Sequence, residues 1–552
     1  MAAEKIMNSK EEKLYQLLIC LLALFGFLGV FGEVMEPDGA LYASTAKNII
    51  LHQDWLNLYG RGTDWLDKPH LPFWLSALSY KVFGISAFAY KLPSFLIGLL
   101  GGWYVYKLAK SLCDKKTGLM STVIFLSALH VLTSTFDVRA EIYITTFTLA
   151  SIYHYYRAQH TSALHLVAGS FFAACAIMVK GIFVLIPVFA GFIIYWLLTK
   201  QYQQLLKLKW WLAIVLIFVF ISPELYSLYT QFDLHPEKVV FGTTGVSGLK
   251  FFFWDSQFGR FFNSGPIKGR GDKFFFLHTT LWAFLPWSVL LYTAVANLFK
   301  KKNRTELPAE IIILWASAAV TFLLFSFSKF QLPHYILIIF PQFAIITAVY
   351  LRKLEGKSLK VFYTIHNVLF VLIFVLLGII AVVFNFDYSY LAIGLLIVVL
   401  VAAFILFKGV LVQTMMARNA FIGIGLMLFL YLFFYPAIVQ YQGGMNAGKW
   451  LKANHPEAKA AVLLNIDAFS FDFYAKGEVK YLMSYEDLDK VRGMKDLVIY
   501  VPEQELARLK SEYKAEVLKS FNNYHITKLT AKFLNEKTRQ GVLEHLYLVR
   551  IY

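Results

Sequence analysis

The sequence predicts an all-α polytopic membrane protein with about 13 transmembrane helices, followed by a small soluble α/β domain. Of the 552 residues, 58% are hydrophobic, which is too many for a soluble protein with one core. Apolar runs of roughly 17 to 25 residues, long enough to cross about 30 Å of hydrocarbon, recur between Leu14 and Val439. After Val439 the composition becomes mixed and charged. We therefore expect a membrane domain at 1–440 and a second domain at 441–552.

Basic clusters in the short loops predict how the chain is oriented. They fall in every second loop, at Lys5 to Lys13, Lys115-Lys116, Lys200 to Lys209, Lys300 to Arg304 and Arg352 to Lys360. Short loops rich in lysine and arginine tend to stay in the cytoplasm. The N-terminus is then cytoplasmic, and an odd number of spans places the C-terminal domain on the non-cytoplasmic side. Because no small-residue cleavage site follows the first span, we expect an uncleaved anchor.

Composition and motifs argue against several classes of function. The net charge of +17 reflects the loop clusters, which suit membrane lipids with anionic headgroups, so nucleic acid is not an expected partner. The sequence has neither a Walker-type loop nor a Gly-x-Gly-x-x-Gly motif after a strand, which argues against nucleotide chemistry. It also lacks the His-Glu-x-x-His spacing of a metal site, and its 13 histidines are scattered.

An acidic cluster follows the first predicted span. Glu33, Glu36 and Asp38 lie within six residues, where an apolar helix leaves the bilayer. Charge at a membrane face needs solvent, a partner or a function, so we interpret this acidic cluster as a candidate site. The alternative is a solvated loop that only ends the helix.

The first outer loop, at 31–90, is too long for a plain connector. Its apolar residues predict two helices in the plane of the membrane surface, at 41–50 and 71–83. Between these helices, Asp67 and Lys68 precede two prolines and an aromatic pair, so Lys68 is presented on a stiff segment. The alternative is a lysine that only reaches toward the headgroups.

A second long outer loop, at 230–275, is rich in cations. Its centre is a glycine-rich basic turn at 265–271, in which Arg270 supplies a planar fork suited to phosphate oxygens. Cations on this face indicate an anionic ligand, and the alternative is binding to lipid headgroups alone.

Shorter outer connections add single ionisable groups. They are Asp137, Arg139, Glu141, Lys180 and Lys329. Acidic and basic residues that are far apart in the sequence thus fall on one membrane face, which is typical of a site between helices and interface. Nucleotide donors are absent from that face, so a donor would have to arrive as a lipid.

An ordered series of motifs resembles the bacterial aminoarabinose lipid A transferase family, over residues from about 14 to 350. The motifs are Pro37-Asp38-Gly39-Ala40-Leu41-Tyr42-Ala43, Asp67-Lys68-Pro69 with Phe73-Trp74, Met178-Val179-Lys180-Gly181, Trp254 to Phe261, Leu285-Pro286-Trp287, and Ser328 to Leu337. The resemblance implies the GT-C fold of the protein O-mannosyltransferase-like glycosyltransferases. It also implies the bacterial inner membrane as location, a polyprenyl-phosphate (undecaprenyl-phosphate) sugar donor used on the periplasmic face, and a C-terminal domain in the periplasm.

The resemblance further implies roles for individual residues. Asp38 matches the essential aspartate of the family, and Lys68 matches the lysine of its Glu-Lys-Pro motif. Arg260 and Tyr335 match residues that contact the carrier phosphate, to which the basic turn adds Arg270. Glu141 is the second catalytic candidate, in competition with Asp137, because many relatives have an acidic residue after the third span.

The sequence also departs from the family pattern. Gly39 and Leu41 stand where the family has a glutamate and an arginine, Asp67 replaces the glutamate of Glu-Lys-Pro, and Gln257 replaces a histidine that helps to hold a metal. No cofactor is therefore predicted, with a divalent metal as the alternative. Candidate contacts to sugar or acceptor are Glu36, Asp67, Gln257 and Lys329. The acceptor is left open as lipid A, another glycan or a protein.

These residues predict a membrane glycosyltransferase that inverts the anomeric centre in a single displacement. Asp38 would engage the acceptor while Lys68, Arg260 and Tyr335 hold the donor phosphate. The alternatives are a transporter or flippase for lipid-linked sugars and a noncatalytic glycolipid-binding relative. Charge at one face and large outer loops favour the enzyme, because transporters place such residues near the bilayer midplane.

The region after Val439 is predicted to be a cover or an acceptor-docking module. It alternates strand-like segments at 461–466 and 497–501 with helix-like segments at 485–492 and 504–519. Residues 545–551 suit a closing edge strand.

Overall fold

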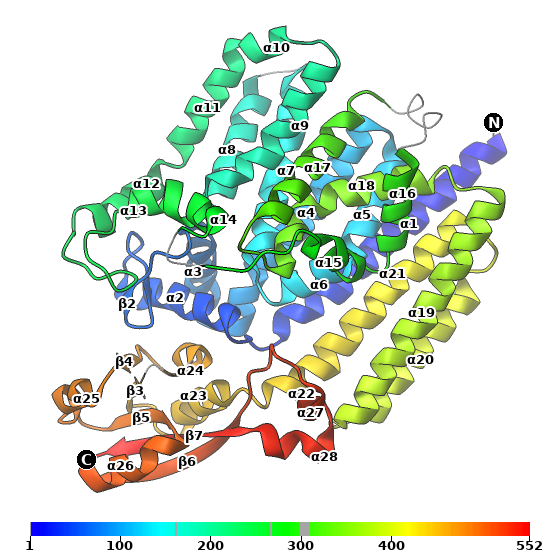
Figure 1. Ribbon diagram of the computed structural model, residues 1–552. Coiled ribbons are helices and arrows are strands. Elements are labelled where there is room, and N and C mark those ends of the chain that lie inside the picture. Colours follow the sequence, from blue (N-terminus) through cyan, green and yellow to red (C-terminus); the bar gives the residue numbers. More distant parts are fainter. Residues whose placement is uncertain (1, 161–162, 265–267, 299–307, 465, 467) are drawn as a thin grey trace.

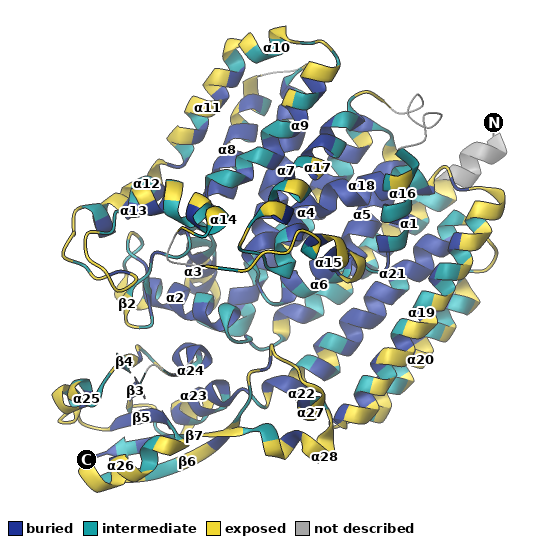
Figure 2. Ribbon diagram, viewed as in Figure 1, coloured by how far each residue is buried: buried dark blue, intermediate teal, exposed yellow. Residues whose placement is uncertain are grey.

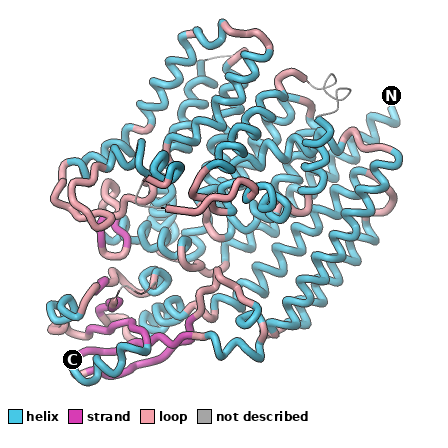
Figure 3. Tube along the Cα trace, in the orientation of Figure 1, coloured by secondary structure: helices cyan, strands magenta, loops and turns pink. Residues whose placement is uncertain are grey.

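The computed structural model describes residues 2–552 apart from 161–162, 265–267, 299–307, 465 and 467. Helices form one large body, and a smaller domain with a sheet lies against one end of it (Figure 1). Figure 3 shows the same division, with most strands confined to the smaller domain. The basic cluster from Lys300 to Arg304 lies wholly outside the described residues, as do parts of the predicted basic turn and of the predicted strand at 461–466.

The helical body is built from long helices that are joined by short connections. They are α1 (Ala2–Leu28), α4 (Ala87–Leu112), α5 (Lys115–Ser127), α6 (Leu129–Phe136), α7 (Ala140–Ala158), α8 (Ala163–Lys180), α9 (Leu185–Leu198), α11 (Leu208–Phe220), α16 (Ser288–Leu298), α17 (Ile311–Phe327), α18 (Phe340–Leu351), α19 (Gly356–Phe384), α20 (Ser389–Leu406) and α21 (Val412–Phe429). Shorter helices and turns connect them: α10 (Gln203–Leu206), α12 (Ser222–Leu228), α13 (Gly248–Lys250), α14 (Arg260–Phe262), α15 (Phe275–Ala283), α22 (Tyr435–Val439), the π-helix η4 (Phe251–Gly259) and the 3-10 helix η6 (Pro333–Ile339).

The chain is a multi-pass membrane protein by the length and apolarity of its helices. Six helices in the described part are long and apolar enough to cross a membrane, and the number is eight if the bent pairs α5–α6 and α11–α12 each form one span. Three further apolar helices, α9, α16 and α17, are shorter. The predicted number of spans and their sidedness stay predictions.

Exposed apolar surface marks the faces that would meet lipid. On α19, Leu372, Leu376 and Ile379 are each more than half exposed, although their side chains are apolar. Figure 2 shows exposed residues along α19 and α20, whereas the helices at the centre of the body are buried. Exposed apolar surface of this extent fits a hydrocarbon environment rather than water.

The first outer loop folds as two short helices with a hairpin between them. The helices are α2 (Asp38–His52) and α3 (Leu71–Phe83), which confirms the predicted segments 41–50 and 71–83. The hairpin pairs β1 (Tyr59–Gly60) with β2 (Thr63–Asp64) and was not predicted. These elements lie on the side of the helical body that faces the C-terminal domain (Figure 1).

The C-terminal domain contains a five-stranded mixed sheet of order β4-β3-β5-β7-β6. Its elements are α23 (Gly443–Asn454), β3 (Lys459–Leu463), α24 (Phe469–Tyr474), β4 (Lys480–Leu482), α25 (Tyr485–Val491), β5 (Leu497–Pro502), α26 (Leu506–Glu512), β6 (Ala515–Asn523), α27 (Ala531–Leu534), α28 (Glu536–Arg539) and β7 (Glu544–Ile551). β3 is parallel to β4 and β5, and β7 is antiparallel to β5 and β6. Two apolar clusters cover the sheet, one with Val462 and Tyr500 and the other with Leu463 and Ile499.

Two predictions for this domain are wrong. The helix predicted at 504–519 ends at Glu512, and residues from Ala515 form β6, because pairing with β7 overrides the helix propensity of Ala, Glu, Leu and Lys in this segment. The predicted edge strand β7 lies inside the sheet, between β5 and β6, while β4 and β6 form the edges.

Candidate active site

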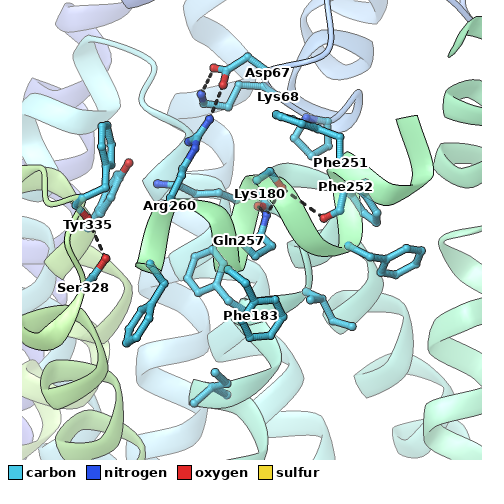
Figure 4. Close-up of a pocket in the computed structure, with 18 of the residues that line it drawn as sticks. Asp67, Lys68, Lys180, Phe183, Phe251, Phe252, Gln257, Arg260, Ser328 and Tyr335 are labelled. Carbon is cyan, nitrogen blue, oxygen red and sulfur yellow. Dashed lines mark hydrogen bonds and ion pairs between the residues drawn. The ribbon is translucent and has the colours of Figure 1, made fainter. Parts of the chain in front are cut away.

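An apolar cavity of about 500 Å³ opens beside the C-terminal ends of α8 and α17, and Figure 4 shows the residues that line it. Phenylalanines from three separate segments provide most of its wall: Phe183, Phe251, Phe252, Phe253, Phe258, Phe261, Phe262, Phe325 and Phe330. Its polar residues gather on one side, where Asp67, Lys68, Arg260 and Tyr335 meet (Figure 4). The cavity therefore has a long apolar part and a charged end.

A second, polar cavity of about 190 Å³ adjoins that charged end. Its polar and aromatic lining residues are Asp38, Tyr42, Trp65, Asp67, Lys68, Arg139, Glu141, Lys180, Arg260, His334 and Tyr335. Asp67, Lys68, Lys180, Arg260, Phe330 and Tyr335 line both cavities. This junction set connects the apolar cavity to the polar one.

Two cations of the junction set bind the same carboxylate. Lys68 pairs with Oδ2 of Asp67, and Arg260 pairs with Oδ1. Burial alone would raise the pKa of the Asp67 carboxyl, but the charges of Lys68 and Arg260 hold that pKa below its usual range. Among the residues that the structure describes, the Nε atom of Arg260 is buried without a hydrogen-bond acceptor. The site thus offers an anion one unused donor and two cations.

Local structure presents these groups. Arg260 begins α14 directly after the π-helix η4, a type of irregular turn that is frequent at functional sites. Lys68 lies two residues before His70, whose backbone N and Nδ1 atoms each lie 3.0 Å from a carboxylate oxygen of Glu224. Both His70 and Glu224 are almost fully buried. This buried pair fixes the segment that carries Lys68 against α12.

Lys180 ends α8 and points into the junction. Its Nζ pairs with Glu141 and lies 3.6 Å from the centre of the Tyr335 ring. The chain then turns through Gly181 at a φ of 107°, and a Cβ at this position would lie 2.2 Å from the Gln257 side chain. Only glycine satisfies both conditions, which explains the Lys180-Gly181 break between α8 and α9.

The acidic candidates of the polar cavity differ in access. Asp38 begins α2 and pairs with Arg139, whose Nε also lies 2.6 Å from Asp137. The Asp38 side chain is 42% exposed, whereas that of Glu141 is 5% exposed and paired with Lys180. Asp137 does not line either cavity. A molecule that enters the polar cavity therefore reaches the Asp38 carboxylate more readily than that of Glu141.

The structure brings most of the predicted site residues together. Asp38, Lys68, Asp67, Glu141, Arg260 and Tyr335 line the polar cavity, and Gln257 lines the apolar one. The other three do not line either cavity. Lys329 and Arg270 are exposed on the protein surface. Glu36 accepts hydrogen bonds from Ser470 in the C-terminal domain, so its interpretation as a sugar or acceptor contact is not supported by its position.

The side chain of Gln257, the residue on which the metal alternative depends, is hydrogen-bonded within the protein. Gln257 donates its amide hydrogens to the Lys180 carbonyl at 3.0 Å and to Ser256 Oγ at 2.6 Å. In the described part of the chain, no three or more His, Cys, Asp or Glu side chains are grouped as metal ligands.

The sequence placed Arg139 and Lys180 on the same membrane face as the site without giving them a role, and it gave none to Tyr42, Trp65 or His334, which also line the polar cavity. Lys180 carries the clearest sequence signal, since it is a charge at the end of an apolar helix. Trp65 carries no such signal in the sequence, because its place in the cavity depends on the hairpin that precedes it.

Comparison with known proteins gives a consistent result. Residues 67–226 match the family described as dolichyl-phosphate-mannose-protein mannosyltransferase. The chain is 28% identical over 360 residues to an uncharacterized protein of Aquifex aeolicus, covering 63% of this chain and 66% of that one. It is 22% identical over 382 residues to undecaprenyl phosphate-alpha-4-amino-4-deoxy-L-arabinose arabinosyl transferase 2 of Proteus mirabilis, covering 64% and 63%. The matches thus span just under two thirds of these relatives.

The fold matches over a greater length than the sequence. The crystal structure of ArnT from Cupriavidus metallidurans bound to undecaprenyl phosphate aligns with a TM-score of 0.77 and 17% identity, covering 97% of each chain. The same protein in the apo state aligns with a TM-score of 0.76 and 16% identity, covering 100% of this chain and 98% of that one.

Proposed function

We propose that this protein, an aminoarabinose lipid A transferase-like chain with the GT-C fold, is a membrane glycosyltransferase that uses a polyprenyl-phosphate sugar. The observation that carries the proposal is the junction set, where an apolar cavity ends at Lys68 and Arg260 and a polar cavity with Asp38 begins. A lipid phosphate sugar has the same order of parts: an apolar tail, an anion and a polar ring. The relatives whose names include an arabinosyl transferase activity support this class of reaction.

The donor phosphate is proposed to bind at Lys68 and Arg260. In the structure these two cations share Asp67 as a counter-ion. A phosphate can replace that carboxylate and engage the unused Nε donor of Arg260, because a guanidinium binds phosphate through parallel hydrogen bonds. Tyr335, which lines both cavities, places its ring beside this position.

The lipid tail is proposed to occupy the apolar cavity. Its volume of about 500 Å³ lies within the usual range for ligand pockets, and its walls are mainly aromatic. Phe258 and Phe262 in its wall are exposed, as is Trp254, which packs against Phe258, so the remainder of a long tail would pass into the surrounding lipid. This arrangement supports a site at the membrane surface.

Transfer is proposed to occur in one displacement. An acceptor hydroxyl oxygen attacks the anomeric carbon, the bond from that carbon to the phosphate oxygen breaks, and its electron pair stays on the phosphate. Lys68, Arg260 and Lys180 stabilise the growing negative charge. Asp38, which is accessible from the polar cavity, accepts the hydroxyl proton. Glu141 holds Lys180 and is the second acidic candidate. The product then has the anomeric configuration opposite to that of the donor, and retention would contradict this step.

The location follows from the same proposal. We place the protein in the bacterial inner membrane, with the N-terminus in the cytoplasm and the site and the C-terminal domain on the periplasmic face. The site and the C-terminal domain lie at the same end of the helical body, which supports a shared side (Figure 1). The sugar and the acceptor, whether lipid A, another glycan or a protein, are left open by these residues.

Carrier recognition can be tested before the sugar is known. Native mass spectrometry of the detergent-purified protein should show bound undecaprenyl phosphate and at least tenfold less bound undecaprenol, because only the phosphate engages Lys68 and Arg260. Dolichyl phosphate, which has the same head group, serves as a control for tail selectivity. Equal retention of the phosphate and the alcohol would contradict the proposed site.

A further inference from the structure

The acidic cluster has two parts with different surroundings. Asp38 faces the polar cavity, whereas Glu33 and Glu36 contact the C-terminal domain. Glu33 accepts a hydrogen bond of 2.6 Å from the Tyr474 hydroxyl and pairs with Lys449 at 2.5 Å. The backbone N–H at Val34 also donates to the Tyr474 hydroxyl, at 2.8 Å.

Glu36 is bound from both its side chain and its backbone. Its Oε1 accepts hydrogen bonds from the backbone N of Ser470 at 2.7 Å and from the Ser470 hydroxyl at 2.5 Å. Its backbone N donates to Oε1 of Gln442 at 3.0 Å, and Nε2 of Gln442 donates to the Val34 carbonyl at 2.9 Å. Gln442 is fully buried, so these contacts exclude water. They fix the chain two residues before Asp38.

Lys47, in the second half of α2, binds that helix to the C-terminal domain. This lysine is almost fully buried, and its Nζ donates to the carbonyls of Asp472 and Ala475 at 2.5 and 3.0 Å. Both carbonyls lie at the C-terminal end of α24, where a cation is favoured by the helix dipole. Burial lowers the pKa of Lys47 to about 8, opposed by the nearby Asp472. The C-terminal domain therefore contacts the chain both before Asp38, at Glu36, and after it, at Lys47.

The hairpin that leads to Trp65 and Asp67 meets the same domain. The guanidinium of Arg61 lies 5.2 Å from the centre of the Phe469 ring, and Gly62 packs against Tyr481. Both segments of the first outer loop that supply cavity residues are thus in contact with one region of the C-terminal domain, 469–481.

We propose that the C-terminal domain works as a clamp on the first outer loop and that Glu36 and Lys47 are positioning residues, which act on transfer through Asp38. This inference rests on the proposed function. It differs from a cover or docking module, because a cover would affect access of the acceptor, whereas a clamp sets the position of the carboxylate relative to the anomeric carbon. Displacement of a reacting group by about 1 Å can cost about 100-fold in rate.

The clamp predicts a fall in kcat without loss of donor binding. Glu36→Ala removes the acceptor for Ser470, and we expect kcat to fall by about 10- to 100-fold. Glu36→Gln keeps an acceptor oxygen and should restore most of kcat. Gly444→Ala tests the contact without removing a charge, since a Cβ there would lie 2.6 Å from the Ser470 hydroxyl and 3.3 Å from the Glu36 carboxylate. The affinity for undecaprenyl phosphate should stay within about twofold of the native value in all three variants, because Lys68 and Arg260 are unchanged. The same binding measurement shows whether each variant is correctly folded.

The experiment compares these variants in membranes that contain the lipid donor and acceptor, with Lys490→Ala as the matched control. Lys490 is exposed and pairs with Asp487 within the same domain. A native kcat in Glu36→Ala and Gly444→Ala would overturn the clamp and leave the proposed function standing. A loss of kcat that Glu36→Gln does not restore would also overturn it. If the native protein itself transfers no sugar from a bound donor, both the clamp and the proposed function are wrong.

Discussion

Replacement of Asp38 by asparagine is expected to lower kcat for sugar transfer by about 10²- to 10⁴-fold, the range for loss of a general base. Asparagine keeps the size of the side chain and an oxygen that can accept from Arg139, so the local structure should persist. It cannot accept a proton from the acceptor hydroxyl. The KM for the lipid donor should change little, because Asp38 lies in the polar cavity and not among the junction set.

Asp54→Asn is the matched control for this experiment. Asp54 lies in the same outer loop, but its Oδ1 accepts hydrogen bonds from the backbone N of Leu56 at 3.0 Å and of Asn57 at 3.1 Å, and it does not line either cavity. The kcat of the Asp54→Asn variant should stay close to that of the native protein. If Asp38→Asn retains native kcat and Glu141→Gln does not, the roles of the two acidic candidates must be exchanged.

Loss of Arg260 should weaken donor binding most strongly. Arg260→Ala is expected to reduce the affinity for undecaprenyl phosphate by about 10- to 150-fold, equivalent to roughly 1.5–3 kcal/mol for charged hydrogen bonds. Arg260→Lys should have an intermediate effect, since it keeps the charge but loses the planar fork. The measurement is a titration of the purified protein with undecaprenyl phosphate.

Arg270→Ala provides the control for this titration. It removes the same charge from the same outer loop, yet Arg270 is exposed and does not line either cavity. An equal loss of affinity in Arg260→Ala and Arg270→Ala would indicate that only the overall charge of the loop matters.

Local signals allowed parts of the fold to be predicted. The helix at 71–83 has the predicted bounds because the spacing of its apolar residues and Pro72 in its first turn act within the segment. β6 could not be predicted in this way, because its residues favour a helix locally and form a strand only through pairing with β7, which comes later in the chain. The position of β7 inside the sheet depends on the same long-range pairing.

Some residues of the candidate site could likewise be predicted from local motifs, and others only from contacts distant in the sequence. Asp38, Lys68 and Arg260 stand in motifs with a recognisable order, and the cavities bring them together. Glu36 stands in the same acidic cluster as Asp38, yet its partner Ser470 lies 434 residues away, so sequence position alone could not separate their roles. Lys180 joins the site through Glu141 on a different helix, a pairing that no local pattern contains.

The similarity to known proteins is consistent with this account. Sequence similarity to the arabinosyl transferase of Proteus mirabilis covers 64% of the chain, whereas the fold of ArnT from Cupriavidus metallidurans covers 97%. The overall architecture therefore extends beyond the region of recognisable sequence. Contacts of the clamp lie in part outside the motifs on which the resemblance is based, which makes Glu36 and Gly444 informative positions for mutation.

Mass spectrometry of polyprenyl-phosphate sugars and surface glycoconjugates tests the central claim most directly, in cells that produce either the native protein or Asp38→Asn. The account predicts that the mutant accumulates one lipid-phosphate sugar while one glycoconjugate loses the mass of that same sugar, which would identify both substrates together. If both pools are unchanged although the mutant protein is folded and abundant, Asp38 does not serve sugar transfer and the account is contradicted.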